Sequence, residues 1–165
     1  MRTVVLLRHG KSARPPGVAD HDRPLTDRGR LAAAAMGKFL TATHQAPDLA
    51  VTSTAVRARD TLLVAHDAGA WSCEVIEVRA LYGASPDDVM AIMRSWPPAA
   101  ARVVVVGHEP TWSETLFRLI AGGRVRFPTA AAASVVFEAA TWGGVGPGEG
   151  ELTWFVPPRL LTDAD

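Results

Sequence analysis

The stretch Thr3-Val4-Val5-Leu6-Leu7-Arg8-His9-Gly10 opens the chain with an apolar run that ends in two basic residues and a glycine. A short run rich in Val and Leu, without polar alternation, is typical of a strand covered on both faces. Residues Arg102 to His108 repeat this pattern, because four consecutive valines precede Gly-His. A third such strand is predicted at Leu49 to Thr52, whereas Cys73 to Val78 alternates apolar residues with Glu and predicts a strand near the sheet edge.

Helical segments alternate with these strands. The clearest start is Ser85-Pro86-Asp87-Asp88, which combines a capping serine, a proline at the first helical position and acidic residues at the positive helix end. Pro97-Pro98 predicts that this helix ends near Trp96. The other predicted elements are helices from Thr26-Asp27 with Leu31, Met36 and Leu40 on one face, from Ser53 or Thr54 to Ala68, and from Pro110 to Gly122-Gly123, and late strands at Ala133 to Ala139 and Leu152 to Val156.

A strand followed by a helix, repeated along the chain, predicts an α/β fold. We expect a three-layer sandwich, with a mostly parallel central sheet and helices on both faces. The chain has 165 residues, of which 48% are hydrophobic, and this is enough for one sizeable core but not for two. We therefore predict a single domain over residues 1–165, with an irregular tail from about residue 158.

Composition excludes several classes of partner. The formal net charge is zero, so no global basic field would attract nucleic acid or an anionic membrane. Cys73 is the single cysteine and cannot form an intramolecular disulfide. No apolar stretch is long enough for a secretion signal or a membrane span. These features predict a cytoplasmic protein without nucleic-acid or membrane partners.

Basic residues gather where the predicted strands end. Arg8 and His9 follow the first strand, Arg57 lies just beyond the second, and His108 follows the valine strand. Ligands of such sheets bind at the carboxyl ends of the strands, so these side chains are expected to meet. An arginine fork binds phosphate through paired, charge-assisted hydrogen bonds. The pattern predicts an anion site.

The helix after the second strand carries Arg57 in its first turn. The helix dipole disfavours a cation there by about 0.3–1 kcal/mol, and a bound anion would reverse this cost. Arg59 lies two positions further on and projects to another side of the helix. Arg57 is therefore the predicted anion ligand of the pair.

Three motifs in this order resemble those of the histidine phosphatase superfamily, which includes the phosphoglycerate mutases. They are Arg8-His9-Gly10, Ser53-Thr54-Ala55-Val56-Arg57-Ala58 and Gly107-His108. The short chain, together with Arg23-Pro24-Leu25-Thr26-Asp27-Arg28-Gly29 and Val106-Gly107-His108-Glu109-Pro110, is similar to the SixA-type phosphohistidine phosphatases. The resemblance implies a phosphoglycerate mutase-like fold.

The resemblance also implies roles for the matching residues. His9 would be the catalytic nucleophile that accepts the phosphoryl group, and Arg8, Arg57 and His108 would bind its oxygens. Fixed cations around a nucleophilic imidazole suit phosphoryl transfer, which depends on positioning and charge stabilisation. We expect no metal and no cofactor.

The proton donor is the least defined part of this predicted site. Glu109 follows His108 at the position where the histidine acid phosphatase branch has Asp, and it is the candidate donor. Asp20 and Asp22 either reach the pocket or bind Arg23. Gly83 stands where similar sequences carry Glu, which removes another candidate.

The scarcity of acids favours phosphohistidine as substrate, because an imidazole leaves more readily than an alkoxide. The expected partner is a phosphorylated protein or a small phosphorylated substrate. The alternatives are a small-molecule phosphate monoesterase and a non-catalytic module that binds a phosphorylated ligand. A mutase is less favoured, because the short chain has little room for the segments that protect its intermediate. The loops around Pro15 to His21 and Pro128 to Ala133 are expected to select what carries the phosphoryl group.

Other residues imitate functional sites. Cys73 and Arg79 have the Cys-x5-Arg spacing of cysteine phosphatases, but two glutamates between them would repel phosphate. Asp20-His21-Asp22 has metal-ligand types, but adjacent residues seldom direct three ligands at one ion. We interpret His44 and His66 as structural and the tryptophans mostly as core or loop anchors. Trp112, close to His108, is also a candidate for the pocket mouth.

Overall fold

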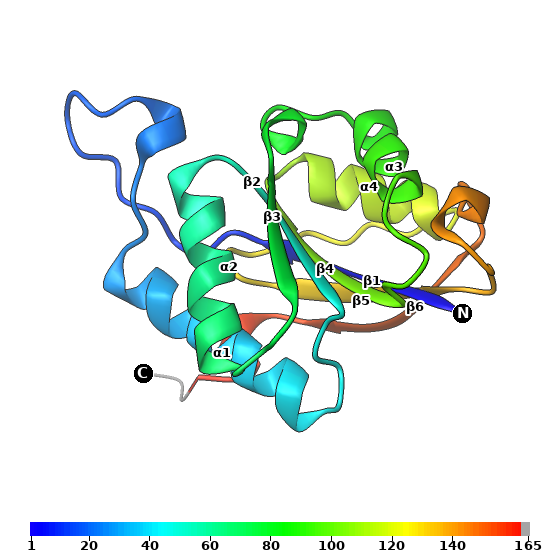
Figure 1. Cartoon of the computed structure of the whole chain (residues 1–165). Coiled ribbons are helices and arrows are strands. Elements are labelled where there is room, and N and C mark those ends of the chain that lie inside the picture. Colours follow the sequence, from blue (N-terminus) through cyan, green and yellow to red (C-terminus); the bar gives the residue numbers. More distant parts are fainter. Residues whose placement is uncertain (163–165) are drawn as a thin grey trace.

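A computed structural model describes residues 1–162, and they form one six-stranded sheet in the order β3-β2-β4-β1-β5-β6 (Figure 1). The strands are β1 (Arg2–Arg8), β2 (Leu49–Ser53), β3 (Glu74–Val78), β4 (Arg102–Gly107), β5 (Ala132–Phe137) and β6 (Gly150–Val156). The part of the predicted irregular tail at residues 163–165 lies outside the described residues.

The pairing of strands confirms the predicted α/β fold with a mostly parallel sheet. β4 pairs in parallel with both β1 and β2, and β2 pairs in parallel with β3 at the sheet edge. β5 and β6 are antiparallel to their neighbours. They are joined without an intervening α-helix, and such a direct connection suits an antiparallel pair.

Four α-helices cover the sheet: α1 (Asp27–Ala42), α2 (Val56–Ala68), α3 (Pro86–Arg94) and α4 (Thr111–Leu119). Figure 1 shows α1 and α2 on one face and α3 and α4 on the other. Successive side chains of β1 point to opposite faces of the sheet. Val4 and Leu6 belong to the core under α3 and α4, whereas Val5 and Leu7 belong to the core under α1 and α2. Each of these side chains is fully buried, and burying one contributes about 1.5–3 kcal/mol.

Two predicted helix starts are confirmed at the level of hydrogen bonds. The Thr26 hydroxyl accepts from the Gly29 amide at the start of α1. Ser85 and Asp88 form a capping box at the start of α3. Both caps satisfy amides that a helix leaves unpaired at its first turn.

Other details of the predicted elements were wrong. α2 begins after Ala55 without a side-chain cap, because Ser53 is the last residue of β2 and its hydroxyl is used elsewhere. Leu31 is 68% exposed and does not belong to the buried face of α1. α4 ends at Leu119, before the predicted Gly122-Gly123.

Within residues 1–162, no helix combines the length and apolar character needed to cross a lipid bilayer.

Candidate active site

The two site histidines meet at the carboxyl edge of the sheet. His9 follows β1 and His108 follows β4, and these strands are neighbours. The His9 amide donates to the Gly107 carbonyl at 3.0 Å, which ties the two strand exits together. The ring centroids of His9 and His108 are 5.3 Å apart with the planes tilted by 54°. Both imidazoles are thus close enough to contact one tetrahedral anion between them.

The glycines beside these histidines are required by packing. A Cβ on Gly10 would lie 2.7 Å from the carbonyl oxygen of Gly29 in α1, and a Cβ on Gly107 would lie 2.6 Å from the Trp112 ring. Trp112 is 1% exposed and lies in the core, so the first of its two predicted places is the observed one. The glycines let α1 and α4 approach the strand exits and thereby fix where the histidines lie.

The tautomer of His9 follows from its hydrogen bonds. Nδ1 lies 2.7 Å from the Gly10 carbonyl oxygen, which can only accept, so Nδ1 carries the proton and donates. Nε2 therefore bears the lone pair, and Arg57 Nε donates to it at 3.3 Å. Burial and the nearby charges of His108, Arg57 and Arg8 lower the pKa of His9 to about 3, against the opposing effect of the Gly10 bond. His9 is consequently a neutral imidazole at pH 7, with Nε2 facing the cations.

Arg57 is held on its far edge by Asp20 of the short 3₁₀ turn Asp20–Asp22. Its NH1 donates to the Asp20 carbonyl oxygen and its NH2 donates to Asp20 Oδ2 at 3.0 Å. The Arg57 side chain is 7% exposed, whereas the Asp20 side chain is 56% exposed. The outer edge of the guanidinium is thus occupied, and the edge bearing Nε is directed at His9.

Asp20 is the centre of a wider network. Its other oxygen, Oδ1, accepts from Arg23 at 3.0 Å, and Tyr82 donates its hydroxyl to Oδ2 at 2.9 Å. These donors hold the pKa of Asp20 well below its usual range, first through Arg23 and then through Tyr82 and Arg57. The two sequence-based options for Asp20 were binding Arg23 or reaching the pocket, and the structure shows both. Sequence reasoning missed Tyr82, which no motif distinguishes.

His108 and Arg8 each present a buried nitrogen without a partner. Nε2 of His108 lies 2.9 Å from Ser53 Oγ, while its Nδ1 has no hydrogen-bond partner among residues 1–162. Arg8 NH1 donates to the Phe127 carbonyl at 2.7 Å, and Arg8 Nε has no partner in the same part of the chain. An unpaired buried donor costs about 1–3 kcal/mol, and an anion bound here would remove that cost.

Burial also sets the charge of these two residues. Desolvation lowers the pKa of His108 to about 4, with Arg57 as the next cause. The pKa of Arg8 is lowered by burial and raised in part by the charge of Glu109. With Asp20 paired, the arginines leave a cationic pocket around two neutral imidazoles, an arrangement able to bind a phosphoryl group beside a nucleophile.

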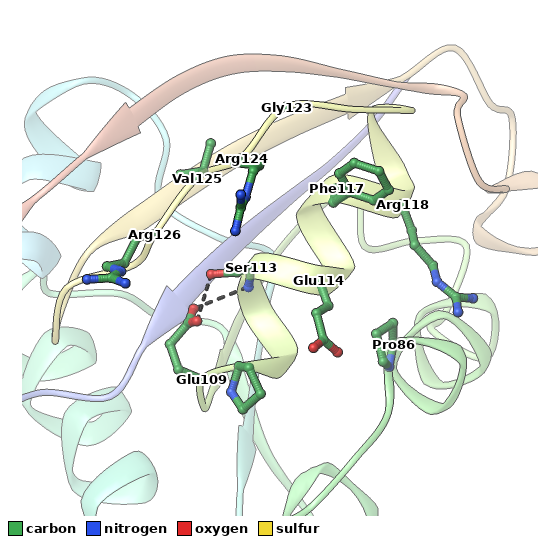
Figure 2. A pocket seen from close by; sticks show the side chains of 11 residues that line it. Pro86, Glu109, Ser113, Glu114, Phe117, Arg118, Gly123, Arg124, Val125 and Arg126 are labelled. Atoms are coloured by element: carbon green, nitrogen blue, oxygen red, sulfur yellow. Dashed lines mark hydrogen bonds between the residues drawn. The ribbon is translucent and has the colours of Figure 1, made fainter.

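The carboxylate of the candidate donor Glu109 is bound by Ser113 of α4. It accepts from the amide of Ser113 at 3.2 Å and from the hydroxyl of Ser113 at 2.6 Å. Figure 2 shows it at one end of a groove of about 880 Å³ that runs along α4. Within residues 1–162, Glu109 has no hydrogen bond to either site histidine, and its role as a donor stays a prediction.

Cys73 and Arg79, which have the spacing of a cysteine phosphatase motif, lie outside the cluster of His9, His108, Arg8 and Arg57. Arg79 stacks over the Tyr82 ring at 5.0 Å, and Cys73 precedes the edge strand β3. Arg59 pairs with Asp60 at 3.5 Å, as expected for a side chain that turns away from Arg57. His66 lies 3.1 Å from the Cys73 carbonyl, which fits a structural role. Among residues 1–162, no group of three or more His, Cys, Asp or Glu side chains is placed to hold a metal ion.

Comparison with known families identifies the class of protein. The sequence profile of the histidine phosphatase superfamily (branch 1) matches residues 4–83, which contain His9 and Arg57. A relative from Mycobacterium tuberculosis, described as uncharacterized, is 40% identical over 93% of this chain and 100% of its own length. An uncharacterized Mycobacterium leprae protein is 32% identical over the same shares. The chain belongs to the histidine phosphatase superfamily, as its motifs predicted.

Solved structures place it more narrowly, in the SixA-type branch. A structure assigned to phosphohistidine phosphatase SixA of Nakamurella multipartitia has a TM-score of 0.83 and 32% sequence identity, and the match covers 95% of this chain and 96% of that one. The protein histidine phosphatase SixA complexed with tungstate has a TM-score of 0.85 at 24% identity, with 97% and 99% covered, and this likeness concerns the fold. The family and these neighbours support phosphatase activity on phosphorylated substrates.

Proposed function

We propose that this protein hydrolyses protein phosphohistidine through a covalent phospho-His9 intermediate, in the cytoplasm and without a metal. The observation that carries the proposal is the state of His9. Its Nδ1 proton is fixed on the Gly10 carbonyl, its Nε2 lone pair faces Arg57, and its pKa is lowered to about 3. A nucleophile must be unprotonated, and His9 is held so throughout the physiological pH range.

The first step transfers the phosphoryl group to His9. A bond forms between His9 Nε2 and phosphorus while the bond from phosphorus to the substrate imidazole breaks, and the released nitrogen takes a proton from water. The phosphoryl oxygens would lie against the Nε edge of Arg57, Arg8 Nε and His108 Nδ1. The last two nitrogens are buried and have no partner within residues 1–162, so binding would supply what they lack.

The second step returns the enzyme. Water attacks phosphorus, the bond to His9 Nε2 breaks, and inorganic phosphate leaves as the water proton is lost. The same cations stabilise the charge on the equatorial oxygens in both steps. They supply the charge that a metal ion provides in other phosphatases, which supports the metal-free mechanism.

The substrate class is supported by the state of the carboxylates. Asp20 is held ionised by Arg23, Tyr82 and Arg57, and an acid with a strongly lowered pKa donates poorly. Glu109 is bound by Ser113. An alkoxide leaving group would need a proton from one of them, whereas a phosphohistidine imidazole would not. SixA, the name assigned to the Nakamurella structure, is a phosphohistidine phosphatase, and this agrees with the proposal.

The test compares substrates in the presence of EDTA. Phosphohistidine should be hydrolysed with kcat/KM at least about 100-fold above that of sugar and nucleotide monophosphates. His9→Ala should abolish hydrolysis of phosphohistidine and of the monophosphates. Its circular dichroism spectrum should match that of the wild type, and its thermal unfolding should remain cooperative. A preference for one of the monophosphates would instead assign a small-molecule monoesterase, and loss of activity on adding EDTA would contradict the metal-free mechanism.

A further inference from the structure

We propose that the groove along α4 binds the polypeptide that flanks the phosphohistidine, as an extended segment with acidic side chains lying against Arg124 and Arg126. This inference rests on the proposed function and adds the recognition of the partner. The groove lies between α4 on one side and residues 123–126 on the other (Figure 2). Its volume of about 880 Å³ is much larger than a phosphoryl group needs.

One wall of the groove has the character of an open strand edge. Val125 packs against the core below α4, whereas Arg124 and Arg126 on either side of it are exposed. This alternation is that of an extended chain. No backbone hydrogen bond within residues 1–162 uses the amide or carbonyl of residues 124, 125 or 126. An extended peptide could pair with these free groups, as peptides do when they add a strand to a sheet edge.

Each wall of the groove is connected along the chain to a residue that belongs to the phosphoryl site or contacts it. Phe127, which follows the arginine wall directly, accepts a hydrogen bond from Arg8 NH1 at 2.7 Å through its carbonyl oxygen. On the opposite wall, Glu109 follows His108 directly and lines the same groove. The groove thus begins one residue beyond His108, so the polypeptide that flanks a bound phosphohistidine can extend into it.

Charge selects the kind of peptide. Arg124 and Arg126 have no ion pair or side-chain hydrogen bond within the described residues, whereas Arg118 in the same groove is paired with Asp87. Figure 2 shows Arg124 extending from its segment toward α4. Acidic side chains of a bound peptide would satisfy the two free arginines.

The helix wall limits where those acidic side chains can lie. Glu114 is exposed on α4 and lines the groove opposite the arginines, so it would repel a carboxylate placed against the helix. Phe117, which is 52% exposed, offers an apolar contact on that wall instead. The expected ligand thus presents acidic residues to the arginine wall and an apolar residue to α4.

Two peptides with a central phosphohistidine test this inference, one flanked by aspartates and the other by lysines. The wild-type protein should hydrolyse the aspartate peptide with kcat/KM about tenfold higher, a ratio that two weak ion pairs can supply. Arg124→Ala with Arg126→Ala should abolish the preference and leave turnover of a generic aryl phosphate within about twofold.

The matched control is Lys38→Ala with Arg159→Ala. This variant removes the same net charge from exposed positions on α1 and beyond β6, away from the groove, and it should keep the preference. Equal hydrolysis of both peptides by the wild type, or a preference that survives loss of both groove arginines, would overturn the inference.

Failure of the proposed function would be visible separately, as the absence of hydrolysis of either phosphohistidine peptide, whether or not aryl phosphate is turned over. In that case, fluorescence anisotropy with labelled forms of the same two peptides tests binding in the groove without requiring turnover. Tighter binding of the aspartate peptide that depends on Arg124 and Arg126 would support it, and equal binding would refute it.

Discussion

Asp20 accepts hydrogen bonds from both terminal nitrogens of Arg57, one through its carbonyl oxygen and one through its carboxylate. This grip leaves the Nε edge of the guanidinium on the His9 ring. Asp20 is thus a positioning residue for Arg57. Its carboxylate is also an anion close to the site, so it would oppose the binding of phosphate itself.

These two effects predict a separation of kcat from KM in Asp20→Asn. Freed from the charged partner, Arg57 would sample other orientations, and kcat should fall about 10- to 100-fold. KM should stay equal or decrease, because a negative charge near the phosphoryl group is removed. Steady-state kinetics on an aryl phosphate measure both constants. Asp22→Asn is the control, because Asp22 lies in the same turn but pairs with His21, and neither constant should change. An unchanged kcat in Asp20→Asn would refute the positioning role.

Arg57 and Arg59 form a natural pair for comparison. Arg57→Lys removes the planar fork that donates from three nitrogens, and kcat/KM should fall about 100-fold or more. Arg59→Lys alters an ion pair with Asp60 at a half-exposed position and should change kcat/KM less than about twofold. Similar losses in the two variants would mean that Arg57 has no special place in the site.

The buried histidines predict an acid-sensitive fold. The folded protein holds His9 and His108 with pKa values of about 3 and about 4, below the ordinary value of 6.5, so the unfolded chain binds more protons between these limits. Stability must therefore fall as pH decreases from about 6.5, and His9 alone should cost about 2 kcal/mol at pH 5.

Urea unfolding at pH 7 and pH 5 measures this effect. His9→Gln should lose less stability between the two pH values than the wild type loses. His66→Gln is the control, because that histidine has a partial exposure and contacts a backbone carbonyl outside the site. An equal loss in wild type and His9→Gln would show that His9 is not held neutral.

Glu109→Gln tests whether Glu109 is the proton donor. Because Ser113 binds the Glu109 carboxylate and the phosphohistidine leaving group needs no strong acid, hydrolysis of phosphohistidine should change less than about threefold. A loss of about 100-fold, in the range of general acid catalysis, would instead make Glu109 the proton donor. Kinetics at several pH values distinguish the two outcomes.

Much of the fold could be predicted from the sequence, because the inner parallel strands are short apolar runs and the clearest helix starts carry capping residues. The capping box of Ser85 and Asp88 is local and could be read directly. The start of α2 could not, because Ser53 remains in β2 and its hydroxyl contacts His108, a residue far away in the chain. The prediction that Leu31 is buried was wrong for a related reason. Helical periodicity shows which residues share a face of the helix, but not how much of that face the rest of the protein covers.

The site also has a part that could be predicted from the sequence and a part that could not. His9, His108, Arg8 and Arg57 lie at strand exits, so a topological argument brings them together. The Asp20 network depends on a loop conformation, and only the structure shows that one carboxylate receives donors from Arg23, Tyr82 and Arg57. Arg124 and Arg126 of the groove could not be predicted from the sequence either. No motif or periodic pattern marks them, and only the structure shows that they have no partner within residues 1–162.

Trapping the phosphorylated intermediate is the decisive test of whether His9 is the nucleophile. A phosphoryl donor and acid-free quenching, followed by mass spectrometry of the digested protein, would locate the phosphoryl group. We predict an acid-labile group on His9, attached at Nε2 as judged by phosphorus NMR, and its absence from His9→Ala. A phosphoryl group on another residue, such as Ser53 beside His108, or turnover that persists in His9→Ala, would contradict nucleophilic catalysis by His9.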